Sequence, residues 1–367
     1  MAAAASAGGL DEVVAAHTVL SEVDGAAGRL VIRGASLDDL AGRVGFEALT
    51  RSLWDGFYEG LPDGAALARA LGRARAEAFE AAPDGADPAL LALPPYQAVR
   101  ALTARLPDGQ GLDVALRLLA APAVYGPWIV RAQAGETPVP PDPALGHAAD
   151  VLRMLRGRPA SADEAAALDA YLVTVSDHGL NASTFAARVV ASTAAGLTSA
   201  VLAGLGALYG PLHGGAPGPV LDMLDAIGSA DRAEAWLDDA IGSGERLMGF
   251  GHRIYRVRDP RADALKAALA RLDPDAGRLR LAEAVEAAAL AVLRRRKPGR
   301  PLETNVEFYT ALLLEALGFP RALFTGVFAM GRTAGWLAHA REQAATGRLI
   351  RPQSVYVGPR PGAPLAA

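Results

Sequence analysis

The chain of 367 residues contains no cysteine. That absence excludes disulfide bonds, thiolate metal sites and a cysteine nucleophile, and it is typical of an intracellular protein. Aromatic residues are also scarce, with 9 Phe, 8 Tyr and 4 Trp, although 51% of all residues are hydrophobic. The core must therefore be built from Ala, Leu and Val, which favours closely packed helices over a sheet sandwich.

The chain also has no strong excess of positive or negative charge. Its formal net charge is only −4, and the charged residues are spread along the chain. The sequence therefore indicates no basic field for nucleic acid. Residues 1–9 are rich in alanine and lack the Lys and Arg of a signal or transit peptide, so we interpret them as a disordered lead-in. We expect the protein to be cytoplasmic.

A long uninterrupted apolar run is missing too. The most membrane-like stretch is 194–212, but several glycines and a proline interrupt it. A membrane-spanning helix needs about 20 predominantly apolar residues. The small residues suit a helix that packs tightly against another, in the core or at a subunit interface, so we predict no membrane span.

Strand signals are confined to the ends of the chain. Two short runs of β-type residues, Thr18–Val23 and Arg29–Ile32, flank a turn with two glycines and predict an N-terminal β-hairpin. Ser354–Val357 is a further candidate strand near the C-terminus.

The rest of the pattern is helical. Apolar residues recur at the spacing of one helix face in 265–272 and again in 281–292. The segment Ser161–Leu172 begins with a serine that can cap a helix, and acidic residues follow in its first turn. The sequence therefore predicts a mostly α-helical protein.

Three of the six histidines lie in conspicuous surroundings. His178 lies in SDHGLNASTF (176–185), His213 in GPLHGGA (210–216), and His252 in MGFGHRIYRVRDPR (248–261). An isolated histidine is most often simply half-buried. Glycines beside His213 and His252, however, allow a ligand to approach the backbone closely. The Gly/Pro cluster 210–218 is either a hinge or a site loop, and the residues alone leave both interpretations open.

Arginines crowd the same regions. Four of them lie in 253–261, and two more stand at Arg332 and Arg351. A single arginine is equally well explained as part of a solvated surface. Together they suit a small polycarboxylate and a phosphorylated cofactor, because arginine binds both kinds of oxyanion in bidentate fashion.

These motifs closely resemble the signature regions of the citrate synthase family, and the resemblance is strongest in 176–192, 209–216, 248–261 and 305–358. A weaker resemblance runs from about Gly9 through Leu172, so nearly the whole chain is covered in order. The runs GPLHGGA, MGFGHRIYRVRDPR and FAMGRTAGWLAH are long and very specific.

The resemblance implies an all-α, multi-helical fold of the citrate synthase type with a minor N-terminal β-hairpin. It implies a large domain, formed by 10–213 and 311–367, and a smaller domain, 214–310, that closes over the substrate. It also implies a homodimer whose active sites include residues from both subunits.

The resemblance further implies which residues react. His213 resembles the histidine that hydrogen-bonds the thioester carbonyl as the enol develops. His252 resembles the histidine that polarises the oxaloacetate carbonyl and protonates the new alkoxide. Proton removal beside a thioester carbonyl independently requires a positioned base and a donor at the forming enolate oxygen.

The catalytic base is the point at which the chain departs from the family, which usually has Asp in an Asn-Val-Asp run. This chain has Asn305-Val306-Glu307, preceded by Thr304 where Pro is common. Glu keeps the carboxylate but adds a methylene, and a misplacement of about 1 Å can cost roughly 10²-fold in rate. Either the backbone compensates, or activity is lowered, or Glu307 is only a surface carboxylate.

The remaining site residues are implied to bind. The substrate carboxylates would be held by Arg261 and Arg332, with Arg351 from the partner subunit, and His178 would be a further substrate contact. Arg256 and Arg300 match basic positions that meet CoA phosphates. A CoA thioester would be a co-substrate, and we expect no permanently bound cofactor and no metal, because the chain has no HExxH spacing.

Three functions remain open. The first is a citrate synthase, an acyltransferase of the tricarboxylic acid cycle that condenses acetyl-CoA with oxaloacetate and water to give citrate and CoA. The second is a close neighbour, either a 2-methylcitrate synthase that uses propionyl-CoA or a lyase that cleaves citryl-CoA. The third is a non-catalytic paralogue that senses CoA or a metabolite, which only Glu307 supports. No GxGxxG, Walker or GxSxG motif is present, so dehydrogenase, ATP-driven synthetase and serine hydrolase functions have no support.

Overall fold

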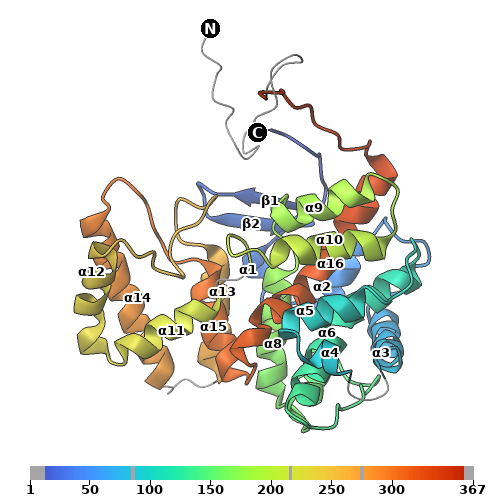
Figure 1. The fold of residues 1–367 in the computed structure, drawn as a ribbon, viewed down its shortest axis with the longest axis horizontal. Helices are drawn as coiled ribbons and strands as arrows, with labels where there is room; N and C mark the ends of the chain where they lie inside the picture. Colours follow the sequence, from blue (N-terminus) through green and yellow to red (C-terminus); the bar gives the residue numbers. More distant parts are fainter. Residues whose placement is uncertain (1–12, 84–86, 215–216, 273–276, 359–367) are drawn as a thin grey trace, which may run out of the picture.

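The computed structural model describes residues 13–83, 87–214, 217–272 and 277–358 (Figure 1). The lead-in expected at 1–9 lies outside these described residues. Within them, helices form nearly all of the regular structure, so the predicted all-α fold class is confirmed.

The predicted N-terminal hairpin is confirmed and carries a third strand that we did not predict. The small antiparallel sheet has the order β1 (Ser21–Asp24), β2 (Arg29–Ile32) and β3 (Ala35–Ser36). Leu30 and Ile32 point into the core, whereas Arg29 and Val31 are more accessible, as expected when one face of a sheet is buried.

The candidate strand Ser354–Val357 is wrong, because this segment has no regular secondary structure. Its side chains are exposed, and no strand of the described chain pairs with it. A strand is stable only when its backbone groups find partners, which β-propensity alone does not provide.

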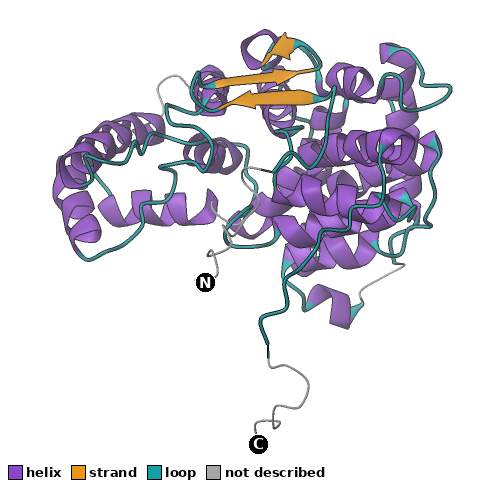
Figure 2. Ribbon diagram, turned by 90° about the horizontal axis from the view of Figure 1, so that it is seen from above, coloured by secondary structure: helices purple, strands orange, loops and turns teal. Residues whose placement is uncertain are grey.

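The helices fall into two groups, which Figure 1 shows on the right and on the left. The larger group consists of α1 (Leu37–Leu40), α2 (Phe46–Trp54), α3 (Gly64–Glu80), α4 (Pro88–Leu91), α5 (Pro95–Thr103), α6 (Leu112–Gln133), α7 (His147–Arg156), α8 (Ala162–Val175), α9 (Ala182–Ala191), α10 (Leu197–Leu208) and α16 (Phe324–Thr346). The smaller group consists of α11 (Pro217–Ile227), α12 (Ala233–Gly242), α13 (Pro260–Leu272), α14 (Gly277–Arg296) and α15 (Val306–Ala316). The seen-from-above view in Figure 2 shows the same separation.

The smaller group matches the expected small domain in outline. The expected boundary at Thr310 falls inside α15, so a division there would cut a helix. Helices α13 and α15 pack on each other, and α13 also packs on α8 of the larger group. The domain division therefore stays a prediction, while the packing shows how the two groups are joined.

Helix α6 runs through the larger group and is the most apolar long helix. Of the described helices it alone is long and apolar enough to cross a membrane, and 83% of its most apolar window is buried inside the molecule. The stretch 194–212 that we singled out from the sequence instead contains α10, which has only 12 residues. This helix is apolar but too short to be a candidate span.

Helices α8 and α16 pack closely where α16 carries glycines. A Cβ on Gly335 of α16 would lie 2.3 Å from the Ser176 carbonyl oxygen, and one on Gly331 would lie 2.8 Å from the Leu172 oxygen. Only glycine permits so close an approach of two backbones. This contact brings Arg332, between the two glycines, against the end of α8.

Candidate active site

Two of the predicted histidines lie side by side at the junction of the two helix groups. His178 follows the end of α8, and His252 lies in the loop before α13. Their rings are 5.5 Å apart in an edge-on arrangement. Tyr255 joins them, because its hydroxyl lies 3.1 Å from His178 Nε2 and its ring lies 4.8 Å from the ring of His252.

The hydrogen bonds of His252 determine which ring nitrogen carries the proton. Its Nδ1 accepts the backbone N–H groups of Ile254 at 3.0 Å and Tyr255 at 3.1 Å. Burial and the charge of Arg261 lower the pKa of His252 to about 4, so the ring is neutral near pH 7. The one remaining proton is therefore on Nε2. Arg261 Nη2 lies 3.3 Å from this nitrogen, so two donors face the same place.

His213 lies in the turn after α10 and contacts a serine. Its Nε2 is 2.8 Å from Ser183 Oγ, which also accepts a hydrogen bond from Trp336 Nε1 at 3.2 Å. The serine can donate its single proton to His213 or to Asn181 Oδ1, 2.8 Å away. When the proton goes to His213, the neutral ring carries its own proton on Nδ1, free to donate.

The charge state of His213 follows from its surroundings. Burial lowers its pKa to about 4, and the charges of Arg332 and Arg261 act in the same direction. Burial also holds the pKa of His178 well below its ordinary value, helped by Arg261 and by the other two histidines. All three histidines are thus neutral hydrogen-bonding groups near pH 7.

Glu307 lies in the first turn of α15 and is half-buried. Its backbone N–H donates to the capping side chain of Asn305 at 3.0 Å, and Asn305 Nδ2 donates to the Gly251 carbonyl at 2.8 Å. The start of α15 is thereby tied to the His252 loop. Burial raises the pKa of Glu307 to about 7, against the opposing charges of Arg246 and Arg261. Such a pKa suits a general base near neutral pH.

Arg261 is buried and held by one carboxylate. Its Nε and Nη2 donate to the two oxygens of Asp259, at 3.0 Å and 2.7 Å. Burial opposes its charge, but Asp259 outweighs it and keeps the pKa of Arg261 above its ordinary value. Arg261 acts on the pKa of each of the three histidines and of Glu307, so it stands at the centre of the cluster.

Arg332 is held differently. Only 1% of it is exposed, its Nε donates to the Val175 carbonyl at 2.6 Å, and its guanidinium lies 4.8 Å from the Phe328 ring centre. Among the described residues no carboxylate lies within 4.0 Å of it. Burial lowers the pKa of Arg332 to about 10. A buried cation without a paired carboxylate is costly, and it favours binding of an anionic ligand.

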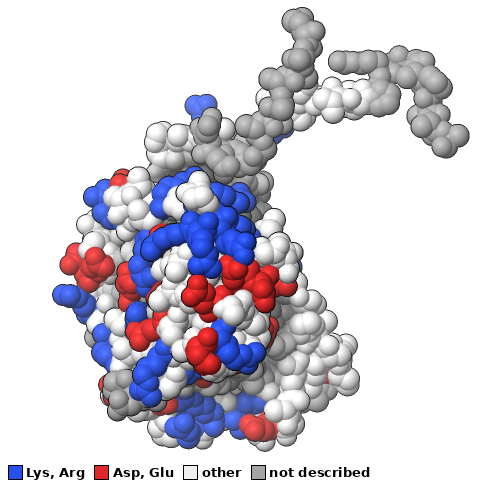
Figure 3. All heavy atoms as spheres, turned by 90° about the vertical axis from the view of Figure 1, so that its left-hand side faces the viewer, with Lys and Arg blue, Asp and Glu red and all other residues white. Residues whose placement is uncertain are grey.

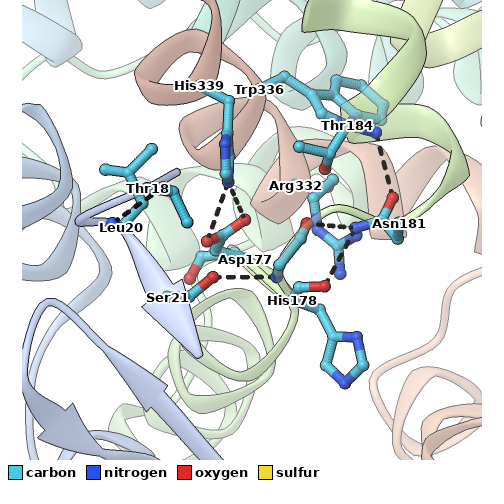
Figure 4. A network of polar contacts seen from close by, with 12 residues as sticks. Thr18, Leu20, Ser21, Asp177, His178, Asn181, Thr184, Arg332, Trp336 and His339 are labelled. Atoms are coloured by element: carbon cyan, nitrogen blue, oxygen red, sulfur yellow. Dashed lines mark hydrogen bonds and ion pairs between the residues drawn. The ribbon is translucent and has the colours of Figure 1, made fainter. Parts of the chain in front are cut away.

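A second polar network fixes the segment that carries His178 (Figure 4). His339 Nδ1 lies 2.8 Å from Arg188 Nη1, which can only donate, so the Nε2 proton of His339 faces Asp177 Oδ1 at 3.1 Å. Burial by itself would raise the pKa of Asp177, but His339 and Ser21 lower it below its ordinary value. Figure 4 shows the His178 ring turned away from the Asp177 carboxylate, so this carboxylate does not occupy the ring that contacts Tyr255.

For three predicted site residues the structure shows no contact with the site histidines. Arg256 is exposed on the His252 loop, Arg300 is exposed after α14, and Arg351 is exposed on the segment beyond α16. Figure 1 shows this last segment leaving the body of the molecule. The roles of all three remain predictions.

One known protein family matches nearly the whole chain. The family described as citrate synthase, C-terminal domain, matches residues 9–353. The chain belongs to the citrate synthase family. A Mycobacterium tuberculosis protein provisionally named citrate synthase 2 is 40% identical over 97% of this chain and 94% of its own. A 2-methylcitrate synthase of the same species is 35% identical over 95% of this chain and 90% of its own.

The fold of the citrate synthase family is also shared with solved structures. A citrate synthase from Thermoplasma acidophilum, solved as a ternary complex with carboxymethyl coenzyme A and oxaloacetate, superposes with a TM-score of 0.84. The two chains are 28% identical, and the match covers 97% of each.

Three residues that support the predicted site residues were not themselves predicted from the sequence. Ser183, Tyr255 and Asp259 all lie within the quoted motifs, beside histidines and arginines that we had singled out. Their hydrogen-bonding side chains were the available signal. The Asp177–His339 pair offered no local signal, because 161 residues lie between its members and only the fold joins them.

Proposed function

We propose that the protein is a citrate synthase that condenses acetyl-CoA with oxaloacetate and water to give citrate and CoA. One observation supports this most strongly: two buried arginines, Arg261 and Arg332, lie among three neutral histidines, and no described carboxylate lies within 4.0 Å of Arg332. A small dicarboxylate with a reactive carbonyl group fits that arrangement in charge and in hydrogen bonding. The binding of oxaloacetate and a CoA analogue by the Thermoplasma relative supports the same substrates.

The first chemical step is removal of a methyl proton from acetyl-CoA. Glu307 accepts this proton, the C–H electron pair moves to form the C=C bond of the enol, and the thioester oxygen takes up negative charge. His213 donates a hydrogen bond to that oxygen. A donor of this kind is worth on the order of 10²–10³ in rate, and it is needed because a carboxylate is a weak base against a carbon acid.

The second step forms the carbon–carbon bond. The enol carbon attacks the ketone carbon of oxaloacetate, and the ketone oxygen becomes an alkoxide. His252 Nε2–H and Arg261 lie where they can donate to that oxygen, and His252 delivers its proton to the alkoxide. Water then hydrolyses the thioester of citryl-CoA and releases CoA.

The binding of CoA is proposed to use exposed basic residues at the edge of the smaller helix group. Figure 3 shows acidic and basic side chains together on this face. Arg295 and Arg296 pair with Asp238 of α12, whereas Arg256 and Arg300 have no ion pair with a described carboxylate. Arginines without such a partner suit the phosphates of CoA. We propose that CoA is bound only as a co-substrate and that no cofactor is bound permanently.

We also propose a homodimer in which Arg351 completes the partner's site. Its support is that Arg351 is exposed, on a segment that leaves the body of the molecule beyond α16. The exposed side chains of Leu349 and Val357 on this segment suit burial against a second subunit.

A 2-methylcitrate synthase is the second candidate, because a relative of that name is nearly as similar as the first one compared. The test is release of CoA from acetyl-CoA and from propionyl-CoA, each with oxaloacetate, followed with a thiol reagent. The protein contributes no background thiol, because it has no cysteine. We expect faster release from acetyl-CoA. Faster release from propionyl-CoA would favour the second candidate, and release from neither would contradict both.

A further inference from the structure

The N-terminal hairpin touches the loops of two site histidines. At the start of β1, Ser21 Oγ accepts the backbone N–H of Gly179 at 2.9 Å, next to His178. At the turn after β1, the Gly25 carbonyl accepts the backbone N–H of Arg256 at 2.9 Å, in the His252 loop. A strand of four residues spans roughly 13 Å, so one short strand connects the two loops.

The contact at the turn leaves no room for a side chain. A Cβ on Gly25 would lie 2.4 Å from the Ile254 carbonyl oxygen and 2.8 Å from its carbonyl carbon. Gly25 is not among the residues with positive φ, so its backbone conformation is open to other residues. Close approach to the His252 loop, not turn geometry, is therefore what requires glycine here.

The residue pressed against Gly25 is also one that holds the catalytic ring. Ile254 donates its N–H to His252 Nδ1 at 3.0 Å, while its C=O lies against Gly25. A displacement of Ile254 would therefore reach the imidazole directly. The hydrogen bonds from Ile254 and Tyr255 are what keep the proton on Nε2, facing the proposed substrate carbonyl.

The hairpin is anchored in the core, so it can limit the movement of the His252 loop that lies against it. Leu20, Leu30 and Ile32 are at most 1% exposed. The turn is shaped by Asp24, whose Oδ1 accepts the N–H groups of Ala26 at 3.1 Å and Ala27 at 2.9 Å. A loop with several glycines lies against an element that is anchored in the core.

We propose that Gly25 is a positioning residue for His252: the hairpin turn holds the His252 loop in the register that keeps the Nε2 proton directed at the substrate carbonyl. The inference rests on the proposed function. It assigns a part in the reaction to a hairpin that lies more than 200 residues before His252 in the chain.

The test is Gly25→Ala in the full chain, with two readouts. Nitrogen-15 NMR of the labelled histidines, with the His252 signals assigned by their loss in His252→Asn, reports the tautomer. We expect one tautomer with the proton on Nε2 in the wild type and a mixture in Gly25→Ala. We also expect kcat/KM for oxaloacetate to fall by about 10²-fold, the size expected for a misplacement of about 1 Å, with little change in KM for acetyl-CoA.

Two further variants separate positioning from folding. Ala27→Ser adds one atom to an exposed position of the same turn, and we expect both readouts to match the wild type. Asp24→Ala adds no atoms but removes the cap of the turn, so it should shift the tautomer in the same direction by less. It also tests the proposal if Gly25→Ala fails to fold. Asp24→Asn, which keeps the accepting oxygen, should restore the wild-type spectrum.

The outcomes distinguish the inference from the proposed function. If the wild type releases no CoA from any thioester but the His252 tautomer still depends on Gly25, the proposed function fails and the structural coupling stands. If folded Gly25→Ala and Asp24→Ala both keep the wild-type His252 spectrum and wild-type kcat/KM, the inference is overturned while the proposed function is untouched.

Discussion

The candidate site has two halves that are held in different ways. His178 and Arg332 belong to the larger helix group and are 5% and 1% exposed. Packed helices hold both residues in place. Around them the Asp177–His339 pair and the Val175 carbonyl fix side chains and backbone. His213 and His252, by contrast, lie in glycine-containing turns.

The reacting half is held mainly by backbone amides and a helix cap. His252 is fixed by two N–H groups of its own loop, and Glu307 is placed by the Asn305 cap at the start of α15. His178 and Arg332 are thus held by packed helices, whereas His213 and His252 are held by short loops and Glu307 by a helix cap. Burial then adjusts their pKa values, lowering those of His213 and His252 to about 4 and raising that of Glu307 to about 7.

The largest expected effect is in the reacting half. Glu307→Gln keeps the size of the side chain but removes the basic oxygen, so kcat should fall by about 10²–10⁴-fold. Oxaloacetate binding, measured by calorimetry, should be nearly unchanged, because Arg261 and Arg332 remain. Glu303→Gln, four residues earlier and paired with Arg294, is the matched control and should keep wild-type kcat. Near-normal turnover by Glu307→Gln with every CoA thioester tried would remove Glu307 from the reaction.

Glu307→Asp sharpens the same point. The cap of α15 is tied to the Gly251 carbonyl, so the helix start cannot advance easily to compensate for a shorter side chain. We expect Asp to lose activity by about 10–10²-fold. A gain in kcat would show that Glu is a compromised base at this position.

Substitutions in the other half, at Arg332, should change the KM for oxaloacetate. Arg332→Met keeps an unbranched apolar chain in the buried position and removes the charge, so the apparent affinity for oxaloacetate should fall by about 10²-fold, as expected for losing charge-assisted hydrogen bonds. Steady-state kinetics at saturating acetyl-CoA checks this. Arg321→Met, on an exposed ion-paired arginine, is the control and should change neither constant. An Arg332→Met enzyme with unchanged KM would mean that Arg332 binds no substrate carboxylate.

A smaller effect tests whether Arg351, which belongs to neither half, completes the site of the partner subunit. Arg351→Ala and His252→Ala chains should each be nearly inactive alone. After random subunit exchange half of the dimers are mixed and one of their two sites carries both intact residues, so about a quarter of wild-type activity should return. Mass spectrometry of the intact complexes verifies exchange, and verified exchange without recovered activity would exclude the cross-subunit role.

The smallest expected effect is on stability. The folded chain holds the Glu307 proton up to about pH 7, whereas the ordinary pKa is 4.5. Ionisation therefore lowers the free energy of unfolding as pH rises through this window. Glu307→Gln should be more stable than the wild type at pH 8, on the order of 3 kcal/mol, and equally stable below about pH 4.5. Denaturant unfolding at both pH values checks this, and equal stability at pH 8 would show that the carboxylate is not destabilised by burial.

Much of the fold was predictable where the signals are local. The capping box at Ser161, where Glu164 N donates to Ser161 Oγ, begins α8 as predicted. The helical spacing in 265–272 and 281–292 gives α13 and α14, with Leu265 and Val285 in the core. These features depend only on residues within a few positions of each other.

The parts that could not be predicted depend on distant partners. The candidate strand Ser354–Val357 has strand-forming residues but no neighbour to pair with among the described strands. The two buried site arginines, Arg261 and Arg332, are a second example, because the sequence alone gives no reason to expect different pKa values for them. Both are buried, but the adjacent Asp259 raises the pKa of Arg261, whereas burial outweighs the charge of Asp177 and lowers the pKa of Arg332.

The most direct test of the account is exchange of the acetyl-CoA methyl protons with deuterated solvent, followed by NMR or mass spectrometry. Malate replaces oxaloacetate, because it carries the same two carboxylates but no ketone, so the enol cannot condense and must take back a proton from solvent. We expect the wild type to incorporate deuterium into the methyl group, and Glu307→Gln and His213→Ala to incorporate none above background. Deuterium incorporation by Glu307→Gln at the wild-type rate would contradict the assignment of Glu307 as the base.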